Sequence, residues 1–260
     1  MKITFYKYHG AGNDFVIVDD RKLNYSFSTN EIKEICDRKF GIGSDGFILL
    51  RNHIKYDFEM IYYNSDGKTS TMCGNGGRCI VAFANYLKII KTNTVFQAID
   101  GAHEAIIIND SSVLLKMNNI DHISSNENYT FIDSGSPHHV IEQSDLNLVN
   151  IKEKGSKIRY SKMYNPQGVN VNFVQKVSSK EFMIRTYERG VEDETFSCGS
   201  GAVASAVTMR YLGRTKQNKI KMKTLGGDLI ICFEFESSKM FSEITLEGPV
   251  KQVFKGIISF

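Results

Sequence analysis

The chain contains two similar segments, and this internal repeat constrains its fold more than any other feature of the sequence. MCGNGGRCIVAFANYL begins at Met72 and SCGSGAVASAVTMRYL begins at Ser197, so that Cys73 and Cys198 lie 125 positions apart. Each segment has a Cys-Gly-x-Gly loop followed by small and apolar residues at helical spacing. A repeat of this length indicates one structural unit present twice, so we expect two domains of the same architecture.

Four further pairs of segments recur in the same order at offsets close to 125 residues. They are HGAGNDFVIVD and DSGSPHHVIEQ, GIGSDGFILL and QGVNVNFVQ, FEMIYYNSDG and FMIRTYERG, and VFQAIDGAHEAIII and KMKTLGGDLIICF. Any single β-hairpin with a glycine turn resembles another, but five pairs in one order favour a duplication. The predicted domains are residues 1–118 and 119–249, with the tail 250–260 returning to the first domain as a final strand.

Strand-like segments dominate both halves, so the predicted fold class is α+β. Each half has one main helix directly after its Cys-Gly-x-Gly loop, near residues 75–88 and 200–213. A further helix is predicted over residues 30–40, with Ser28, or Thr29 and Asn30, as its start signal. The polar stretch 118–128 is interpreted as the linker between the domains.

Composition excludes several classes of protein. The 260 residues are 42% hydrophobic and 23% charged, as in ordinary globular proteins. No apolar run approaches the roughly 20 residues that a bilayer requires, and no apolar signal core opens the chain, so we expect a cytoplasmic protein without membrane contact. The net charge is only +3 and no compact basic block occurs, so nucleic-acid binding is not predicted.

Cys73 and Cys198 each lie at the predicted start of a helix, in a glycine-rich loop. A helix N-terminus carries about half a positive charge and N–H groups without intrahelical partners. That field stabilises a thiolate, and glycine amides can hold an anionic group such as a carboxylate. The cysteines number five, an odd count that indicates reduced thiols, and we expect Cys36, Cys79 and Cys232 to be core residues.

A duplication related by a pseudo-two-fold axis would place the two thiols on opposite sides of one substrate carbon, across an interdomain cleft. One thiolate would remove the α-proton and the opposite thiol would return a proton to the other face, which is racemisation or epimerisation. Two helix N-termini aimed at the substrate carboxylate would disperse the charge of the carbanion. A redox dithiol is the alternative, because loops close enough for this chemistry are close enough to form a disulfide.

These motifs resemble the diaminopimelate epimerase family over essentially the whole chain, from YHGAGNDFVIVD to EGPVKQVFKG. The most specific pieces are MCGNGGRC and YERG with ETFSCGSGA, while HGAGNDF, FGIGSDG, YNSDG, GSPHHV and GVNVNF follow the family's order. The resemblance implies two similar domains, each with a mixed or antiparallel sheet around a central helix, and an active-site cleft between them. It implies epimerisation of LL- to meso-diaminopimelate for lysine and peptidoglycan precursors, without pyridoxal, another cofactor or a metal. It also implies a homodimer, although no interface can be identified in the sequence.

The same resemblance assigns roles to individual residues. Cys73 and Cys198 would be the base and acid pair. The groups expected at the reacting carboxylate and amine are Gly74, Asn75, Gly199 and Ser200. Glu188 and Arg189 would bind a substrate ammonium and a substrate carboxylate. The distal amino-acid end of the substrate would be held by Asn13, Asn64 and Asn170.

Three positions depart from the family's pattern and bear on fine substrate specificity. Ser136 stands where many members have an asparagine, Gly46 stands where some have a glutamine, and RGVEDETFSCG is one residue longer than usual. His138 is expected to support the site without touching substrate. The adjacent His139 would point to the opposite face of a strand, which argues against a metal pair.

Two other interpretations of the sequence remain. GIGSDG matches the dinucleotide pattern G-x-G-x-x-G, but a helix-like segment precedes it and a strand-like one follows, the wrong order for a nucleotide site. The alternative functions are another two-thiol racemase, such as a proline or hydroxyproline enzyme, or a redox or binding protein on the same scaffold. Glu188, Arg189 and the three asparagines favour a substrate with a second polar end.

Overall fold

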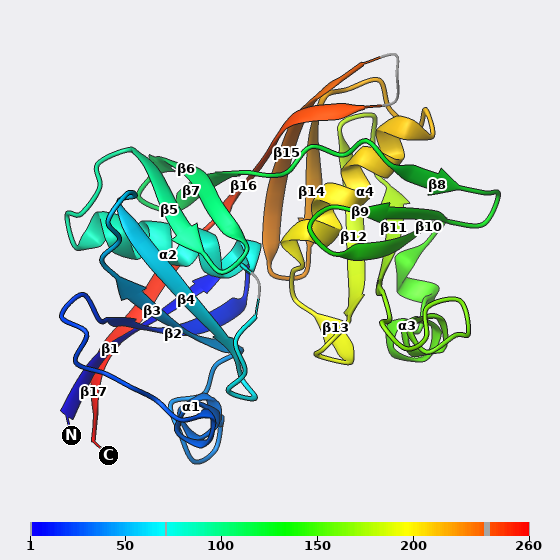
Figure 1. The fold of residues 1–260 in the computed structure, drawn as a ribbon. Helices are drawn as coiled ribbons and strands as arrows, with labels where there is room; N and C mark the ends of the chain where they lie inside the picture. The colour runs from blue at the N-terminus through cyan, green and yellow to red at the C-terminus, as the bar shows by residue number, and fades with distance from the viewer. Residues whose placement is uncertain (1, 71, 237–239, 260) are drawn as a thin grey trace. The chain divides into compact units, whose positions relative to one another are not determined.

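The structure is a computed structural model that describes residues 2–70, 72–236 and 240–259 (Figure 1). It contains two compact units. One is formed by the residues up to Leu115 together with those from Gly248 onwards, and the other by Lys116–Glu247. None of the helices among the described residues is long and apolar enough to cross a membrane.

The first unit is a mixed sheet with two helical crossovers. In the order in which they lie side by side, its described strands are β17 (Lys251–Ser259), β1 (Lys2–Gly10), β2 (Asn13–Asp19), β3 (Gly46–Arg51), β4 (Phe58–Asn64), β5 (Asn93–Ala98), β6 (Gly101–Asn109) and β7 (Ser112–Lys116). The pairs β2–β3 and β4–β5 are parallel and the others are antiparallel. Parallel neighbours need a crossover, and these crossovers carry helices α1 (Thr29–Cys36) and α2 (Gly74–Tyr86).

The second unit has the same plan. Its described strands, in sheet order, are β8 (Ile123–Ser125), β9 (Thr130–Asp133), β10 (Pro137–Glu142), β11 (Asn170–Lys176), β12 (Glu181–Glu188), β14 (Lys219–Thr224), β15 (Gly227–Phe235) and β16 (Phe241–Pro249). A short strand, β13 (Asp193–Thr195), pairs with the end of β12. The parallel pairs are β10–β11 and β12–β14, and their crossovers carry the 3-10 helix η1 (Leu146–Leu148) with α3 (Ile151–Arg159), and α4 (Gly199–Tyr211).

The two sheets follow one pattern of strand directions. Across each sheet the pairings run antiparallel twice, then parallel, antiparallel, parallel, and antiparallel twice. The five repeated sequence segments fall on equivalent elements, for example β4 with β12 and α2 with α4. The predicted α+β fold with an internal duplication is therefore confirmed. The C-terminal tail forms β17, which pairs with β1 in the position that β8 takes beside β9.

Helices α2 and α4 are the central helices of their units. Helix α2 contacts β1, β2, β3, β4 and β6, and α4 contacts β9, β10, β11, β12, β14 and β15. Both helices consist mainly of small and apolar residues, and most of their residues are buried. Helices of this composition are stable when protein surrounds them, which is the environment that these strands provide. Both helices begin within one or two residues of their predicted positions.

The shorter helices α1 and α3 cover the opposite faces of the sheets. Val16 and Val18 of β2 pack against Ile32 and Ile35 of α1. Phe15 points the other way, because a Cβ at Gly76 of α2 would lie 3.4 Å from its ring. Alternation along β2 therefore fills two apolar layers, one on each side of the sheet. In the second unit, α3 and η1 pack against β11 and β12 in the same manner.

Two sequence predictions about local structure are wrong in part. Helix α1 is capped by Ser28, whose hydroxyl accepts from the N–H of Glu31, but it ends at Cys36 rather than near residue 40. Asp37 leaves the helical conformation, and its carboxylate accepts the N–H groups of Lys39 and Phe40 in a turn. Residues 118–128 are not only a linker, since they include β8 and an isolated bridge from Ile120.

Candidate active site

Cys73 is the N-cap residue of α2, and a tight hairpin brings Asn13 beside it. The loop between β1 and β2 consists of Ala11 and Gly12, with φ of 51° and 83°, so both residues adopt the left-handed conformation of a type I′ turn. Asn13 follows directly, and its Oδ1 lies 3.6 Å from the Cys73 sulfur and 3.2 Å from Nδ2 of Asn75. The carbonyl of Cys73 accepts from the N–H of Gly77 at 2.7 Å, which starts the helix.

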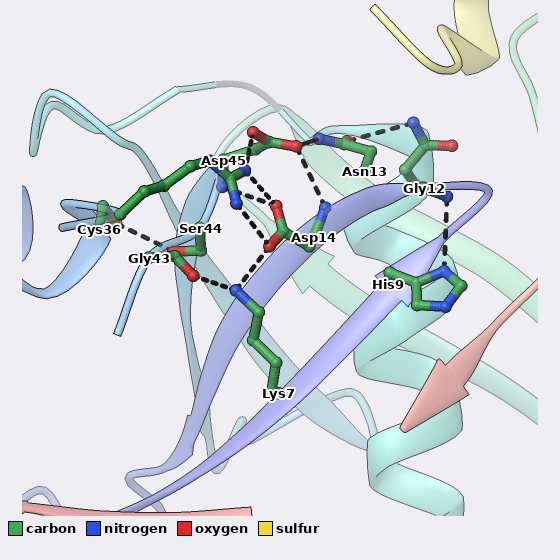
Figure 2. Close-up of polar contacts among 11 residues, drawn as sticks. Lys7, His9, Gly12, Asn13, Asp14, Cys36, Gly43, Ser44 and Asp45 are labelled. Carbon is green, nitrogen blue, oxygen red and sulfur yellow. Dashed lines mark hydrogen bonds and ion pairs between the residues drawn. The ribbon is translucent and has the colours of Figure 1, made fainter. Parts of the chain in front are cut away.

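A network of charged groups holds the other side of Asn13 (Figure 2). Its Nδ2 donates to Oδ2 of Asp45 at 2.7 Å. Arg38 donates to Oδ1 of Asp45 and Oδ1 of Asp14, both at 2.7 Å, and Lys7 pairs with Asp14 at 2.6 Å. Burial opposes ionisation of Asp14, but the hydrogen bonds and charges of Arg38 and Lys7 prevail and lower its pKa to about 2.

Arg78 lies behind the start of α2 and is fully buried. Its guanidinium donates to Oδ1 of Asn75 at 2.6 Å and to the carbonyl of Gly74 at 3.2 Å. β1 passes close to this point, because a Cβ at Gly10 would lie 3.0 Å from the carbonyl oxygen of Asn75. Gly74 and Asn75 therefore stand on a rigid base made of a buried cation and a neighbouring strand.

Gly46 and Asn64 face one another at the ends of β3 and β4. A Cβ at Gly46 would lie 2.6 Å from a ring carbon of Tyr62 and 2.9 Å from the carbonyl oxygen of Tyr63. A side chain at this position therefore requires the Tyr62 ring and this strand to move. Asn64 is exposed.

Cys198 takes the position in the second unit that Cys73 takes in the first. It is the N-cap of α4, it is 8% exposed, and its carbonyl accepts from the N–H of Ala202 at 3.0 Å. Its sulfur lies 3.6 Å from the hydroxyl of Ser200. The carbonyl of Ser200 in turn accepts from the buried hydroxyl of Ser134 at 2.8 Å, which ties the helix start to the end of β9.

His138 is fully buried beneath Ser200, and its two ring nitrogens have different partners. With the Asn172 amide oriented so that its Oδ1 accepts from the Thr186 hydroxyl at 2.9 Å, its Nδ2 donates to Nδ1 of His138 at 2.9 Å. The ring proton is therefore on Nε2, which lies 3.0 Å from both hydroxyls, Ser136 and Ser200. Burial and the charge of Arg189 lower the pKa of His138 to about 3, so the ring is neutral.

Asn170 connects the remaining predicted residues of this unit. It is buried, its Nδ2 donates to Ser136 at 3.2 Å, and its Oδ1 accepts the backbone N–H of Arg189 at 2.9 Å. Glu188 accepts from Thr195 at 2.9 Å. The turn between Glu188 and Thr195 is therefore attached to β12.

Within each unit, most of the predicted residues lie close together. The first unit joins Cys73, Gly74, Asn75 and Asn13, and the second joins Cys198, Gly199, Ser200, Ser136, His138, Asn170 and Arg189. Sequence reasoning missed the groups that support them, namely Asp45, Arg38, Arg78, Asn172, Thr186 and Ser134. The sequence did contain a signal for Asn172, because it lies two residues after the candidate Asn170 and so on the same face of a strand.

The remaining histidine and cysteines lie outside these clusters. Nδ1 of His139 bonds the hydroxyl of Tyr164 at 2.7 Å, whereas the ring of His138 bonds Asn172 and two serine hydroxyls, so the two adjacent histidines have different partners. Cys36 and Cys79 are buried as expected, and burial raises the pKa of both thiols. Cys232 is only partly buried, contrary to the prediction.

Neither a metal centre nor a dinucleotide loop is formed by the candidate residues. No group of three or more His, Cys, Asp or Glu side chains suited to a metal ion occurs among residues 2–70, 72–236 and 240–259. The segment GIGSDG lies between helix α1 and strand β3, the order that the sequence predicted and the reverse of a dinucleotide fingerprint.

Comparison with known proteins identifies the family. The family model described as diaminopimelate epimerase matches residues 5–122 and 130–253. The diaminopimelate epimerase of Flavobacterium psychrophilum is 50% identical over 257 residues, covering 98% of this chain and all of the relative. That of Chlorobaculum tepidum is 38% identical and covers 96% of this chain and 99% of the relative.

Solved structures share the fold at low sequence identity. A phenazine biosynthesis protein of the PhzF family from Bacillus anthracis has a TM-score of 0.79 at 11% identity, with complete coverage of both chains. A hydroxyproline epimerase from Agrobacterium vitis has a TM-score of 0.73 at 15% identity, covering 99% of this chain and 92% of that one. The family match and the similarity to named relatives over nearly the whole chain confirm the resemblance found in the motifs: the chain belongs to the diaminopimelate epimerase family and is an isomerase.

Proposed function

We propose that this chain interconverts LL- and meso-diaminopimelate, with Cys73 and Cys198 as its acid–base pair and without a cofactor. Membership of an isomerase family removes the alternative of a redox or binding protein on the same scaffold. One observation carries the proposal. Each cysteine is the N-cap of a 13-residue central helix, at equivalent positions of two units with the same strand order.

The chemistry follows from what a thiol can do at a helix N-terminus. A thiolate takes the proton from the substrate's α-carbon and becomes a thiol, and the electron pair of the broken C–H bond passes into the carboxylate as an enolate. The thiol on the opposite face gives its proton to the same carbon and becomes a thiolate, so that the configuration is inverted. Amides of the first helical turn, as in Gly74, Asn75 and Gly199, are suited to hold the enolate oxygens.

The groups around the two sulfurs support different hydrogen bonds. The S–H of Cys73 donates to the side-chain amide oxygen, Oδ1, of Asn13. Cys198 faces the hydroxyl of Ser200, which can donate to sulfur while it accepts from Nε2–H of His138. An acceptor beside one sulfur favours its thiol form, and a donor beside the other favours its thiolate form. The two cysteines must begin each turnover in these two different states.

The substrate is proposed from the charged and amide groups near the cysteines. Glu188 suits an ammonium group and Arg189 a carboxylate, while Asn64 and Asn170 would bind the distal amino-acid end. The sequence resemblance predicts Asn13 at that end as well, but its Oδ1 lies 3.6 Å from the Cys73 sulfur, beside the proposed reacting group. The structure leaves Glu188 and Arg189 partly exposed at the end of β12. A cytoplasmic location, a homodimeric state and a place in lysine and peptidoglycan precursor synthesis belong to this proposal as predictions.

Incubation in deuterated water tests the proposed activity. The purified chain, without added cofactor, is supplied separately with LL-diaminopimelate, L-proline and trans-4-hydroxy-L-proline, and deuterium at the α-carbon is followed by NMR. We expect incorporation and inversion only with diaminopimelate. Exchange with proline or hydroxyproline and not with diaminopimelate would replace the proposed substrate, and an absorbance band of bound pyridoxal would contradict a cofactor-free reaction.

A further inference from the structure

A chain of polar groups with a charged group at each end runs past Cys73. Arg78 donates to Oδ1 of Asn75, Nδ2 of Asn75 donates to Oδ1 of Asn13, and Nδ2 of Asn13 donates to Oδ2 of Asp45. The donor–acceptor distances are 2.6, 3.2 and 2.7 Å. The two amides are therefore aligned head to tail between a buried cation and a carboxylate.

The charged ends decide which way each amide faces. A guanidinium has only donors, so Arg78 must face the oxygen of Asn75, which leaves that residue's NH₂ for Asn13. An ionised carboxylate has only acceptors, so Asp45 must face the NH₂ of Asn13. Both requirements direct Oδ1 of Asn13 toward the sulfur of Cys73. If both amides were reversed, the NH₂ of Asn75 would face the guanidinium of Arg78, and the oxygen of Asn13 would face the carboxylate of Asp45.

Asp45 is itself held in place by ion pairs on its far side. It is 43% exposed, but Arg38 joins its Oδ1 to Asp14, and Asp14 is anchored by the buried ammonium of Lys7. Lys7 also donates to the carbonyl of Gly43, in the loop before β3 that carries Asp45. Figure 2 shows Lys7, Asp14, Asp45 and Asn13 linked in turn by polar contacts.

The geometry points to Asp45 and Arg78 as positioning residues that fix the amide of Asn13 so that an acceptor faces Cys73. This inference rests on the proposed role of Cys73 as one of the two acid–base groups. Neither residue reaches the sulfur directly; they act through Asn13 and Asn75. The loop GIGSDG, which resembles a nucleotide motif in the sequence, thereby acquires a role in orienting the reacting thiol.

Substitution of Asp45, the partly exposed end of this row of hydrogen-bonded groups, tests the inference without disturbing the core. In Asp45→Asn, the new side chain no longer presents only acceptors to Asn13, which removes one of the two constraints that direct Oδ1 of Asn13 toward Cys73. Asp45→Glu keeps the carboxylate and is the rescue variant. Asp19→Asn is the matched control, because Asp19 lies at the other end of β2 and, like Asp45, is a partly exposed carboxylate paired with an arginine, in this case Arg21.

Two readouts are measured on the full chain. The first is kcat/KM for α-hydrogen exchange with diaminopimelate. The second is the rate of alkylation of Cys73 and of Cys198 by iodoacetamide at one pH, resolved by mass spectrometry of their peptides. The ratio of the two alkylation rates reports on the surroundings of Cys73 alone, since a general loss of structure would change both.

We expect Asp45→Asn to lower kcat/KM about tenfold and to speed alkylation of Cys73 about fivefold, the size of effect that one hydrogen bond has on an equilibrium. Alkylation of Cys198 should change less than about twofold, and Asp45→Glu should restore much of the activity. Arg38→Gln, which keeps the Asp45 carboxylate but frees it, should show a smaller change in the same direction.

The outcomes separate this inference from the proposed function. If Cys73→Ala is inactive and the Asp45 variants behave like Asp19→Asn in both readouts, Asp45 does not position Asn13 and the inference is overturned. Equal changes in the alkylation of both cysteines would also overturn it. If Cys73→Ala keeps its exchange activity, the proposed function fails, whatever Asp45 does.

Discussion

The substitution Gly201→Ala provides a quantitative test of how the second cysteine is supported. Gly201 lies in the first turn of α4, three residues after Cys198. An added Cβ would lie 2.4 Å from Oδ1 of Asn172 and 3.2 Å from the Cys198 sulfur. Asn172 is fully buried and cannot move into solvent, so its amide must leave the position in which it bonds His138 and Thr186.

Two opposing effects set the expected magnitude. Alanine is a better helix former than glycine by about 1 kcal/mol, which by itself predicts a more stable protein. Displacement of Asn172 breaks two buried hydrogen bonds, and unsatisfied buried partners cost about 1–3 kcal/mol each. The net result is a loss of about 1–5 kcal/mol, or a fall in Tm of roughly 5–10 °C at the middle of that range.

The assay is thermal unfolding followed by circular dichroism, together with α-hydrogen exchange. Gly77→Ala in α2 is the matched control, because its Cβ would meet the sulfur of Met72 at 2.8 Å, the end of a flexible side chain that can move aside. We expect the control to keep or slightly raise its Tm, and Gly201→Ala to lose stability and about tenfold in exchange rate. A Gly201→Ala protein as stable as the wild type would refute the assigned contact with Asn172.

Three further predictions concern protonation. His138 should stay neutral from pH 8 to pH 5 in an NMR titration, because burial and the charge of Arg189 lower its pKa to about 3; a transition near pH 6.5 would contradict this. Burial likewise lowers the pKa of His139 to about 4, so the unfolded chain binds more protons than the folded one below pH 6.5. The unfolding free energy from urea titrations should therefore fall between pH 6.5 and 5, by up to about 2 kcal/mol for each histidine, and a constant value would exclude this linkage. Cys36 and Cys79 should resist iodoacetamide at pH 8 in the native protein, because burial raises the pKa of both thiols; mass spectrometry that finds them labelled as fast as Cys73 would contradict their burial.

The repeat in the sequence was sufficient to predict much of the fold. Each repeated segment contains its own turn and its own apolar periodicity, so local sequence specified equivalent elements, and the starts of α2 and α4 followed from their glycine-rich loops. The end of α1 was missed because Asp37 stops the helix by accepting two backbone N–H groups. Such local competition leaves no trace in the hydrophobic pattern.

The supporting groups of the site were harder to predict than the cysteines. Asp45 meets Asn13 across 32 positions of sequence, and their contact depends on the parallel pairing of β2 with β3. No local pattern encodes that register. Arg78 is an exception in principle, since it lies one helical turn after Gly74 and so on the same face of α2, within reach of the helix start.

The most direct test of the two-thiol mechanism is the fate of the α-hydrogen in single cysteine variants. LL-diaminopimelate is incubated in deuterated water with the wild type, Cys73→Ala or Cys198→Ala, and formation of the deuterated meso isomer is followed by NMR. We expect the wild type to form it and each variant to be slower by a factor of at least about 10². Formation of the meso isomer at the wild-type rate by either variant would contradict the mechanism.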